Sequence, residues 1–101
     1  MRTIHLASLD KVRPVLVLTR EVIRPYLNQI SVAPISSTVR GLATEVPLGR
    51  RNGLDHDCVA NLDSVTTIST AALGRQIGFL LADQEAALTD AIAAAYDLDL
   101  P

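Results

Sequence analysis

The stretch over residues 12–19 most narrows what this chain can fold into. Its residues 15–18 form an unbroken apolar run, which is typical of a strand that is buried on both faces or closes a small barrel. Pro14 cannot donate a backbone hydrogen bond, so we expect the strand to begin near it. Arg13 then lies at the end of a stiff element, where its guanidinium can face a cleft. The simpler alternative is an edge arginine with a packed stem and a solvated head.

Short strand-like segments recur along most of the chain. We predict strands at residues 4–9, 12–19, 29–35, 43–48, 58–61, 64–68 and 75–81. The connections include a turn or one short helix at residues 20–27 and a loop at residues 49–53 that contains an Asn-Gly turn. A single helical turn is expected after the sixth strand, with Ser69 as its N-cap and Gly74 as its C-cap.

A helix is predicted at the end of the chain, from an N-cap at Asp83 through Tyr96. Its apolar residues recur at helical spacing and form one stripe: Leu88, Ala91, Ile92 and Ala95. Many short strands followed by one helix indicate a mainly β fold with some α structure. We expect a small, strongly twisted antiparallel barrel with short helical turns and a C-terminal helix.

Length and apolar content limit the organisation of the protein. A chain of 101 residues is expected to form one domain over residues 1–101. Hydrophobic residues make up 49% of it, and the aromatic ones are only Tyr26, Phe79 and Tyr96, so the core must be aliphatic. A domain this small can bury part of its apolar surface in a dimer interface.

Cysteine content and charge exclude several classes of protein. Cys58 is the only cysteine, so no intrachain disulfide can form; we expect a reducing cytosol and a thiol that behaves as a small buried hydrophobe. There is no signal-peptide pattern, and the apolar runs are too short to span a membrane. The net charge of −2 counts against an unselective nucleic-acid binder, but arginine supplies all the basic residues except Lys11, which suits phosphate contacts.

The second notable segment is a run of hydroxyl residues, Ser36-Ser37-Thr38, that follows a short strand and precedes Arg40 and Gly41. Alone, such a run is more often a turn that satisfies its own backbone. It belongs, however, to an ordered set of motifs: RPVLVL at 13–18, VAPISS at 32–37, EV at 45–46, NLDSV at 61–65 and LGRQIG at 73–78. In this order the motifs resemble the MazF/PemK (Kid) family, the toxin endoribonucleases of type II toxin–antitoxin modules, over nearly the whole chain.

The resemblance implies an SH3-like barrel and a cytoplasmic homodimer. The implied activity is sequence-selective, metal-independent cleavage of single-stranded RNA (mRNA, or tRNA or rRNA) to 2′,3′-cyclic phosphate and 5′-hydroxyl ends. No cofactor is expected, and the implied partner is an antitoxin whose disordered tail orders in the RNA groove. The family's catalytic pair falls on Arg13 and Ser36, with serine here in place of the more usual threonine.

These residue types fit such a reaction, because RNA supplies its own nucleophile, the 2′-hydroxyl, and the enzyme must align it and stabilise charge on the phosphate. Arginine keeps its proton near neutral pH, so we expect Arg13 to act as a clamp and leaving-group donor rather than a base. Ser36 would orient the phosphate or the 2′-hydroxyl. Strand alternation would allow only one of Ser36 and Ser37 to share a groove with Arg13. The further substrate contacts would be Ser37, Thr38, Arg40, Arg50 and Arg51, although a lone surface arginine is more often simply solvated.

Other interpretations stay open at this point. Asp55-His56-Asp57 lacks partners at metal-ligand spacing, so we expect a solvated loop and no metal site. The same barrel could belong to a CcdB-type toxin that binds gyrase without nuclease activity, or to an inactive SH3-like interaction module. The first two strands are joined by a very short turn, where many family members have a long loop over the RNA, so a more open groove is expected.

Overall fold

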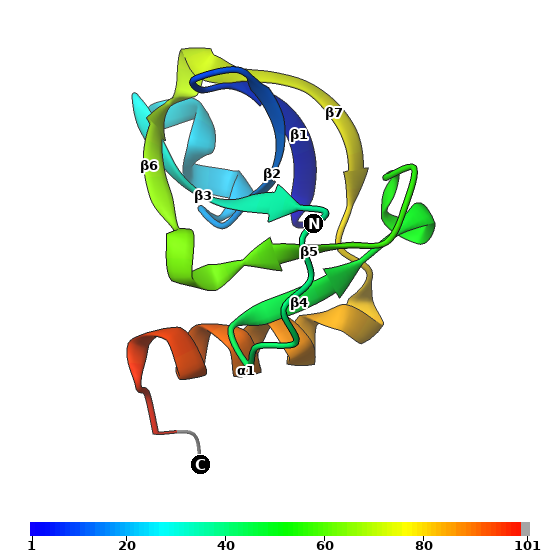
Figure 1. The fold of residues 1–101 in the computed structure, drawn as a ribbon. Helices are drawn as coiled ribbons and strands as arrows, with labels where there is room; N and C mark the ends of the chain where they lie inside the picture. Colours follow the sequence, from blue (N-terminus) through cyan, green and yellow to red (C-terminus); the bar gives the residue numbers. More distant parts are fainter. Residues whose placement is uncertain (100–101) are drawn as a thin grey trace.

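The computed structural model describes residues 1–99, which form a strongly curved antiparallel sheet and one long helix (Figure 1). The strands are β1 (Thr3–Ser8), β2 (Val12–Val17), β3 (Gln29–Ser36), β4 (Glu45–Leu48), β5 (Cys58–Asn61), β6 (Thr66–Ser69) and β7 (Leu73–Phe79). Short 3-10 turns connect them: η1 (Glu21–Tyr26), η2 (Arg50–Asn52), η3 (Leu62–Ser64), η4 (Thr70–Ala72) and η5 (Ala82–Gln84). The helix α1 is Glu85–Tyr96.

Strand β3 is the centre of the sheet. The hydrogen-bonded order is β4-β5-β3-β2-β1-β7, and β6 also pairs with β3. Along one edge β3 therefore meets β2, and along the other it meets β6 and then β5. Figure 1 shows β1, β2, β3, β6 and β7 curving into a ring, while α1 runs along β4 below it. The predicted small antiparallel barrel with a C-terminal helix is confirmed.

The apolar run of β2 is buried on both faces, as its lack of alternation predicts. Val15, Leu16 and Val17 are fully buried. Leu16 belongs to the core cluster that also contains Leu88 and Ala91 of α1. Val15 and Val17 belong to a second cluster, inside the ring, with Ile30 and other residues of β3 and β6. One strand thus separates two cores, which explains why its sequence carries no polar face.

The helix α1 carries the predicted stripe but not the predicted cap. Leu88 and Ala91 are buried, and Ile92 and Ala95 pack partly buried against the same core. Asp83 is not the N-cap, because the turn η5 precedes α1 and takes Asp83 into its interior. The residue before the helix is Gln84, whose Oε1 accepts a hydrogen bond from the Leu81 N–H at 2.9 Å. Within residues 1–99, no helix combines the length and apolar content needed to cross a membrane.

Several strand boundaries differ from the prediction for local reasons. The fourth strand begins at Glu45 rather than residue 43, because the Glu45 carboxylate binds the backbone N–H groups of Arg40 and Leu42 and holds the preceding segment in a turn. The predicted turn with Ser69 as N-cap is confirmed by the Ser69 Oγ, which accepts from the Ala71 N–H at 3.2 Å. Gly74 is not its C-cap but lies inside β7, where a Cβ would stand 2.9 Å from the Leu6 carbonyl oxygen.

The segment between β4 and β5 is fastened to the rest of the fold at its base. Asn52, which is 1% exposed, receives a hydrogen bond on Oδ1 from the Gly49 N–H at 3.1 Å. Its Nδ2 donates to the Phe79 carbonyl at 3.1 Å and to Gln84 Oε1 at 2.6 Å. Gly53 ends η2 with a φ of +88°, as the Asn-Gly signal predicts. The backbones of Asn52 and Gly78 lie so close that a Cβ at Gly78 would overlap the Asn52 carbonyl oxygen.

We therefore expect Gly78→Ala to lower the free energy of unfolding by about 3 kcal/mol, since an overpacked site must move backbone on both sides. Gly41→Ala is the matched control. Gly41 also has a positive φ, +72°, but nothing lies within 4 Å of its Cβ position. Gly41→Ala should lower the free energy of unfolding by only about 1 kcal/mol, the cost of holding a residue with a Cβ in the left-handed conformation. Urea denaturation followed by circular dichroism measures both, and equal losses would contradict the close approach at Gly78.

Candidate functional site

A cavity opens where the ladder between β2 and β3 ends. The register of this ladder ends at Val15 with Pro34. The Leu18 N–H donates to the Ser31 carbonyl of β3, so by alternation Pro14 also faces β3, and it lacks the N–H that would continue the ladder. Beyond this point β3 pairs only with β5, through Ile35 with Ala60 and Ser36 with Val59. The two strand ends diverge around a cavity of about 450 Å³.

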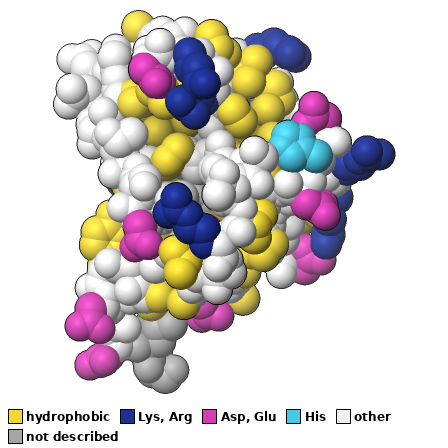
Figure 2. Space-filling model, in the orientation of Figure 1, with side chains coloured by type: hydrophobic (Ala, Val, Ile, Leu, Met, Phe, Trp, Pro, Cys, Tyr) yellow, Lys and Arg dark blue, Asp and Glu magenta, His cyan; other side chains and the backbone are white. Residues whose placement is uncertain are grey.

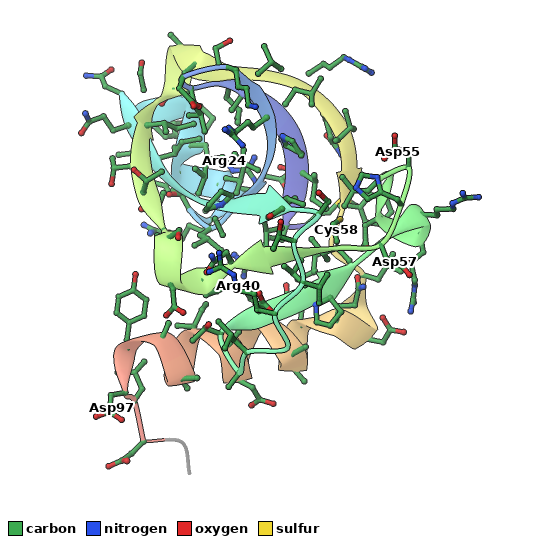
Figure 3. All side chains as sticks on the ribbon, in the orientation of Figure 1. Arg24, Arg40, Asp55, Asp57, Cys58 and Asp97 are labelled. Atoms are coloured by element: carbon green, nitrogen blue, oxygen red, sulfur yellow. The ribbon has the colours of Figure 1, made fainter. Side chains whose placement is uncertain are left out.

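Strand ends form one wall of this cavity and a loop forms the other. The strand wall consists of Arg13, Pro14, Ile35, Ser36, Ser37 and Thr38. The loop wall comes from Leu54, Asp55 and His56 of the segment before β5 and from Cys58, the first residue of β5. Figure 3 shows Asp55 and Cys58 on this segment, to the side of the ring. The predicted residues Arg13, Ser36, Ser37 and Thr38 are therefore brought together.

Arg13 is held at the cavity by a carboxylate across the β1–β2 turn. Its Nε and Nη2 lie 3.1 and 3.4 Å from the two oxygens of Asp10. The hydrogen bond from Arg13, together with that from the Lys11 N–H, holds the pKa of Asp10 below its ordinary value. Nη1 of Arg13 takes no part in the contact with Asp10. The Arg13 side chain is 42% exposed. Extending the β2–β3 register by two residues places Arg13 opposite Ser36.

Ser36 is oriented by its own turn. Its Oγ accepts a hydrogen bond from the Thr38 N–H at 3.0 Å. Because the oxygen acts there as an acceptor, its hydroxyl hydrogen can still donate to an anion. The expectation that strand alternation keeps one of Ser36 and Ser37 out of the groove applies only to a strand that continues past Ser36; β3 ends at Ser36, and both residues line the cavity.

The remaining predicted arginines lie apart from this cavity. Arg50 and Arg51 line an adjoining cavity of about 620 Å³, which shares the side chain of Cys58 with the first. Arg51 also forms an ion pair with Asp83 at 2.8 Å. Arg40 lines neither cavity; Figure 3 shows it in front of β5, on the opposite side from Asp55.

Cys58 forms the partition between the two cavities. It is 4% exposed, which confirms the prediction of a small buried hydrophobe. Burial raises the pKa of its thiol, and the charges of Asp57 and Asp55 raise it further. Its Sγ lies 3.9 Å from the Leu48 carbonyl oxygen, a weak contact. The thiol is therefore neutral near pH 7, and its role here is to separate the two cavities with an apolar surface.

The loop wall contains polar groups that the sequence did not assign to a site. Asp55 and His56 are exposed, as expected for a solvated loop, and the imidazole Nδ1 contacts the Asp55 carboxylate. Both also line the cavity with Arg13. The sequence did contain an indication of their position, because Asp55 and His56 lie just before β5, the strand that pairs with the end of β3. Figure 2 shows acidic and basic side chains gathered around one histidine at the edge of this face.

A metal site would need several coordinating side chains close together. Among residues 1–99, no group of three or more His, Cys, Asp and Glu side chains is placed so that it could hold a metal ion. The positive charge that this cavity can offer comes from Arg13.

The sequence of this chain matches a known protein family and individual proteins. Residues 4–96 match the family described as PemK-like, MazF-like toxin of type II toxin–antitoxin system. The chain is 61% identical over 99 residues to a protein named endoribonuclease MazF3 of Mycobacterium tuberculosis, covering 98% of this chain and 96% of that one.

Solved structures agree. The Mycobacterium tuberculosis toxin MazF-mt6 superposes with a TM-score of 0.95 at 60% identity, over 98% of this chain and 100% of that one. A mycobacterial endoribonuclease in complex with its cognate antitoxin shares the fold, with a TM-score of 0.86 at 21% identity over 98% and 95% of the two chains. The chain therefore belongs to the PemK-like, MazF-like toxins of type II toxin–antitoxin systems.

Proposed function

We propose that this endoribonuclease toxin cuts single-stranded RNA, mRNA or else tRNA or rRNA, at selected sequences in the cavity between β2 and β3. The reaction would need no metal and would leave 2′,3′-cyclic phosphate and 5′-hydroxyl ends. The observation that carries the proposal is that one cavity collects the Arg13 guanidinium and the hydroxyls of Ser36, Ser37 and Thr38. The endoribonuclease names of the relatives support the reaction class.

The proposed chemistry divides the work between charge and orientation. Transesterification by the 2′-oxygen places extra negative charge on the non-bridging phosphate oxygens. Arg13 would exchange part of its contact with Asp10 for those oxygens, since phosphate matches its planar fork. Ser36, oriented by the Thr38 N–H, would donate its hydroxyl hydrogen to the same phosphate. Nothing in this scheme requires a Lewis acid, because a guanidinium supplies the positive charge.

The path of the RNA would extend from this cavity into its neighbour. Arg50 and Arg51 would bind a flanking phosphate there, since both line the neighbouring cavity, and Cys58 lines both cavities. Only residues 9–11 join β1 to β2, so this connection forms no long loop. The RNA could therefore enter the cavity freely. Arg40 would contact the RNA only where it leaves the cavities.

The cellular setting follows from the family. We propose a cytoplasmic homodimer, each subunit one domain over residues 1–101, neutralised by an antitoxin with a disordered tail that orders in the RNA groove. The relative solved with its cognate antitoxin supports this partner. Exposed apolar side chains such as Val39 and Leu42 offer surface for such contacts.

Arg13→Ala should reduce cleavage at least 1,000-fold, on the order of losing the main electrostatic stabiliser of the transition state. The side chain is half exposed and its loss leaves the core intact, so circular dichroism should not change. Arg13→Lys should recover little, because an ammonium cannot reproduce the fork. Single-turnover cleavage of an RNA that carries a mapped site measures both. Cleavage by Arg13→Ala at the parent rate would show that the reaction takes place elsewhere.

Ser36→Ala should lower kcat by about 10- to 1,000-fold, the range for one preorganised donor. Ser37→Ala, the matched control, should cost about tenfold or less, since Ser36 alone of the two has its oxygen fixed by a backbone N–H. Ser36→Thr should retain most activity because it keeps the hydroxyl. The same single-turnover assay applies, and a larger loss at Ser37 than at Ser36 would reverse the assignment.

Cleavage should persist in excess EDTA at an unchanged rate, and the products should resist extension at the 3′ end until the cyclic phosphate is removed to leave a 3′-hydroxyl. Loss of activity in EDTA that Mg²⁺ or Mn²⁺ restores would place the enzyme in another nuclease class. Purified protein that leaves a long mixed RNA intact under all these conditions would favour a gyrase-binding toxin or an inactive interaction module.

A further inference from the structure

The proposed reaction leaves one chemical role without a residue. The 2′-hydroxyl must lose its proton as it attacks phosphorus, and neither a guanidinium nor a serine hydroxyl accepts that proton readily near neutral pH. The inference that follows rests on the proposed function and concerns this missing base. The candidate must line the cavity that holds Arg13 and Ser36.

His56 is the imidazole that lines this cavity. It belongs to the loop before β5, whereas Arg13 and Ser36 lie at the ends of β2 and β3 on the same cavity. Its side chain is 59% exposed, so it can meet a ligand that enters from solvent. The other histidine of the chain, His5, is engaged elsewhere, since its Nδ1 lies 2.9 Å from the Gly74 carbonyl oxygen and its Nε2 lies 3.0 Å from Thr3 Oγ1.

The contact between His56 and Asp55 selects which nitrogen can act. Nδ1 of His56 contacts the Asp55 carboxylate. A carboxylate accepts a hydrogen bond, so the Nδ1 position carries hydrogen and Nε2 holds the lone pair in the neutral ring. The same carboxylate stabilises the imidazolium that forms when Nε2 takes up a proton. This arrangement is the one that a general base requires.

The charges around the imidazole come from several elements. Asp57 is on the same loop and faces the adjoining cavity. Arg13 of β2 lines the same cavity as His56 and is itself paired with Asp10. Arg75 of β7 and Asp55 line a smaller cavity together. The charged group in contact with the imidazole is thus the carboxylate of Asp55.

We propose that His56, oriented by Asp55, is the general base of RNA cleavage. Nε2 takes the proton of the 2′-hydroxyl while the 2′-oxygen forms a bond to phosphorus and the bond from phosphorus to the 5′-oxygen breaks. Arg13, the leaving-group donor expected from the sequence, gives a proton to the 5′-oxygen. The imidazolium then returns its proton to Arg13 through a water molecule in the open cavity, so the enzyme is restored and no other reactant is consumed.

The test is the pH dependence of single-turnover cleavage in the full-length protein, with His56→Ala and His56→Gln beside the parent. The parent rate should rise with pH between about pH 5 and 8, where histidine side chains lose their charge. Both variants should be about 100-fold slower near pH 7, the lower part of the range for general base catalysis, and should lack this rise. Asp55→Asn should cost about tenfold and retain the rise, because Asp55 acts only through His56.

Chemical rescue separates catalysis from a structural effect. Added imidazole should restore His56→Ala at least tenfold, since the cavity is open to solvent, but should not restore Arg13→Ala. Asp90→Asn is the matched charge control; Asp90 is exposed on α1 and lines neither cavity, so its substitution should leave both the rate and its pH dependence unchanged.

Three outcomes would overturn the proposal. One is parent-like cleavage by His56→Ala while Arg13→Ala is inactive, which would leave the proposed function standing. Another is a slow His56→Ala whose rate still rises with pH and does not respond to imidazole, which would make the role of His56 structural. The third is a parent protein that cuts no RNA, which would remove the proposed function as well.

Discussion

The arrangement of the site depends on where two strands stop pairing. Pro14 faces β3 at the end of the β2–β3 ladder and cannot supply the backbone N–H that would extend it. Beyond this point β3 pairs only with β5. The cavity that holds Arg13 and Ser36 lies at this end of the ladder. One missing donor thus ends the pairing where a polar cleft opens in an otherwise apolar barrel.

The strands that line the cavity could be predicted because their sequences carry strong local signals. The unbroken apolar run of β2 and the Asn-Gly turn after β4 each admit few conformations. The start of α1 could not be predicted in detail, because tertiary contacts decide whether Asp83 caps the helix. Gln84 binds Asn52, which is distant in the chain, and Asp83 binds Arg51. Long-range hydrogen bonds of this kind leave no periodic trace in a sequence.

The same limit applies to the site itself. Arg13 stands out from the sequence because it lies at the start of an apolar strand, and Ser36 through the resemblance to the MazF/PemK family. Asp55 and His56 do not, since a polar loop of this composition is usually just solvated. Their place at the cavity follows from the pairing of β5 with the last residues of β3, which carries the loop to the opposite wall. The register between β3 and β5 therefore determines which loop residues reach the cavity, and this register could not be derived from the sequence alone.

The close packing at Gly53 and Gly78 has a consequence for how this family can diversify. The base of the loop is locked, because a side chain at either glycine would collide with the facing backbone, and Asn52 is buried and fully engaged. Leu54 packs against the core, but residues 55–57 are exposed beyond that anchor. Substitutions at residues 55–57 should therefore cost little folding free energy. If Asp55 and His56 act in cleavage as proposed, selection on this loop tip comes from catalysis, whereas selection on its base comes from folding.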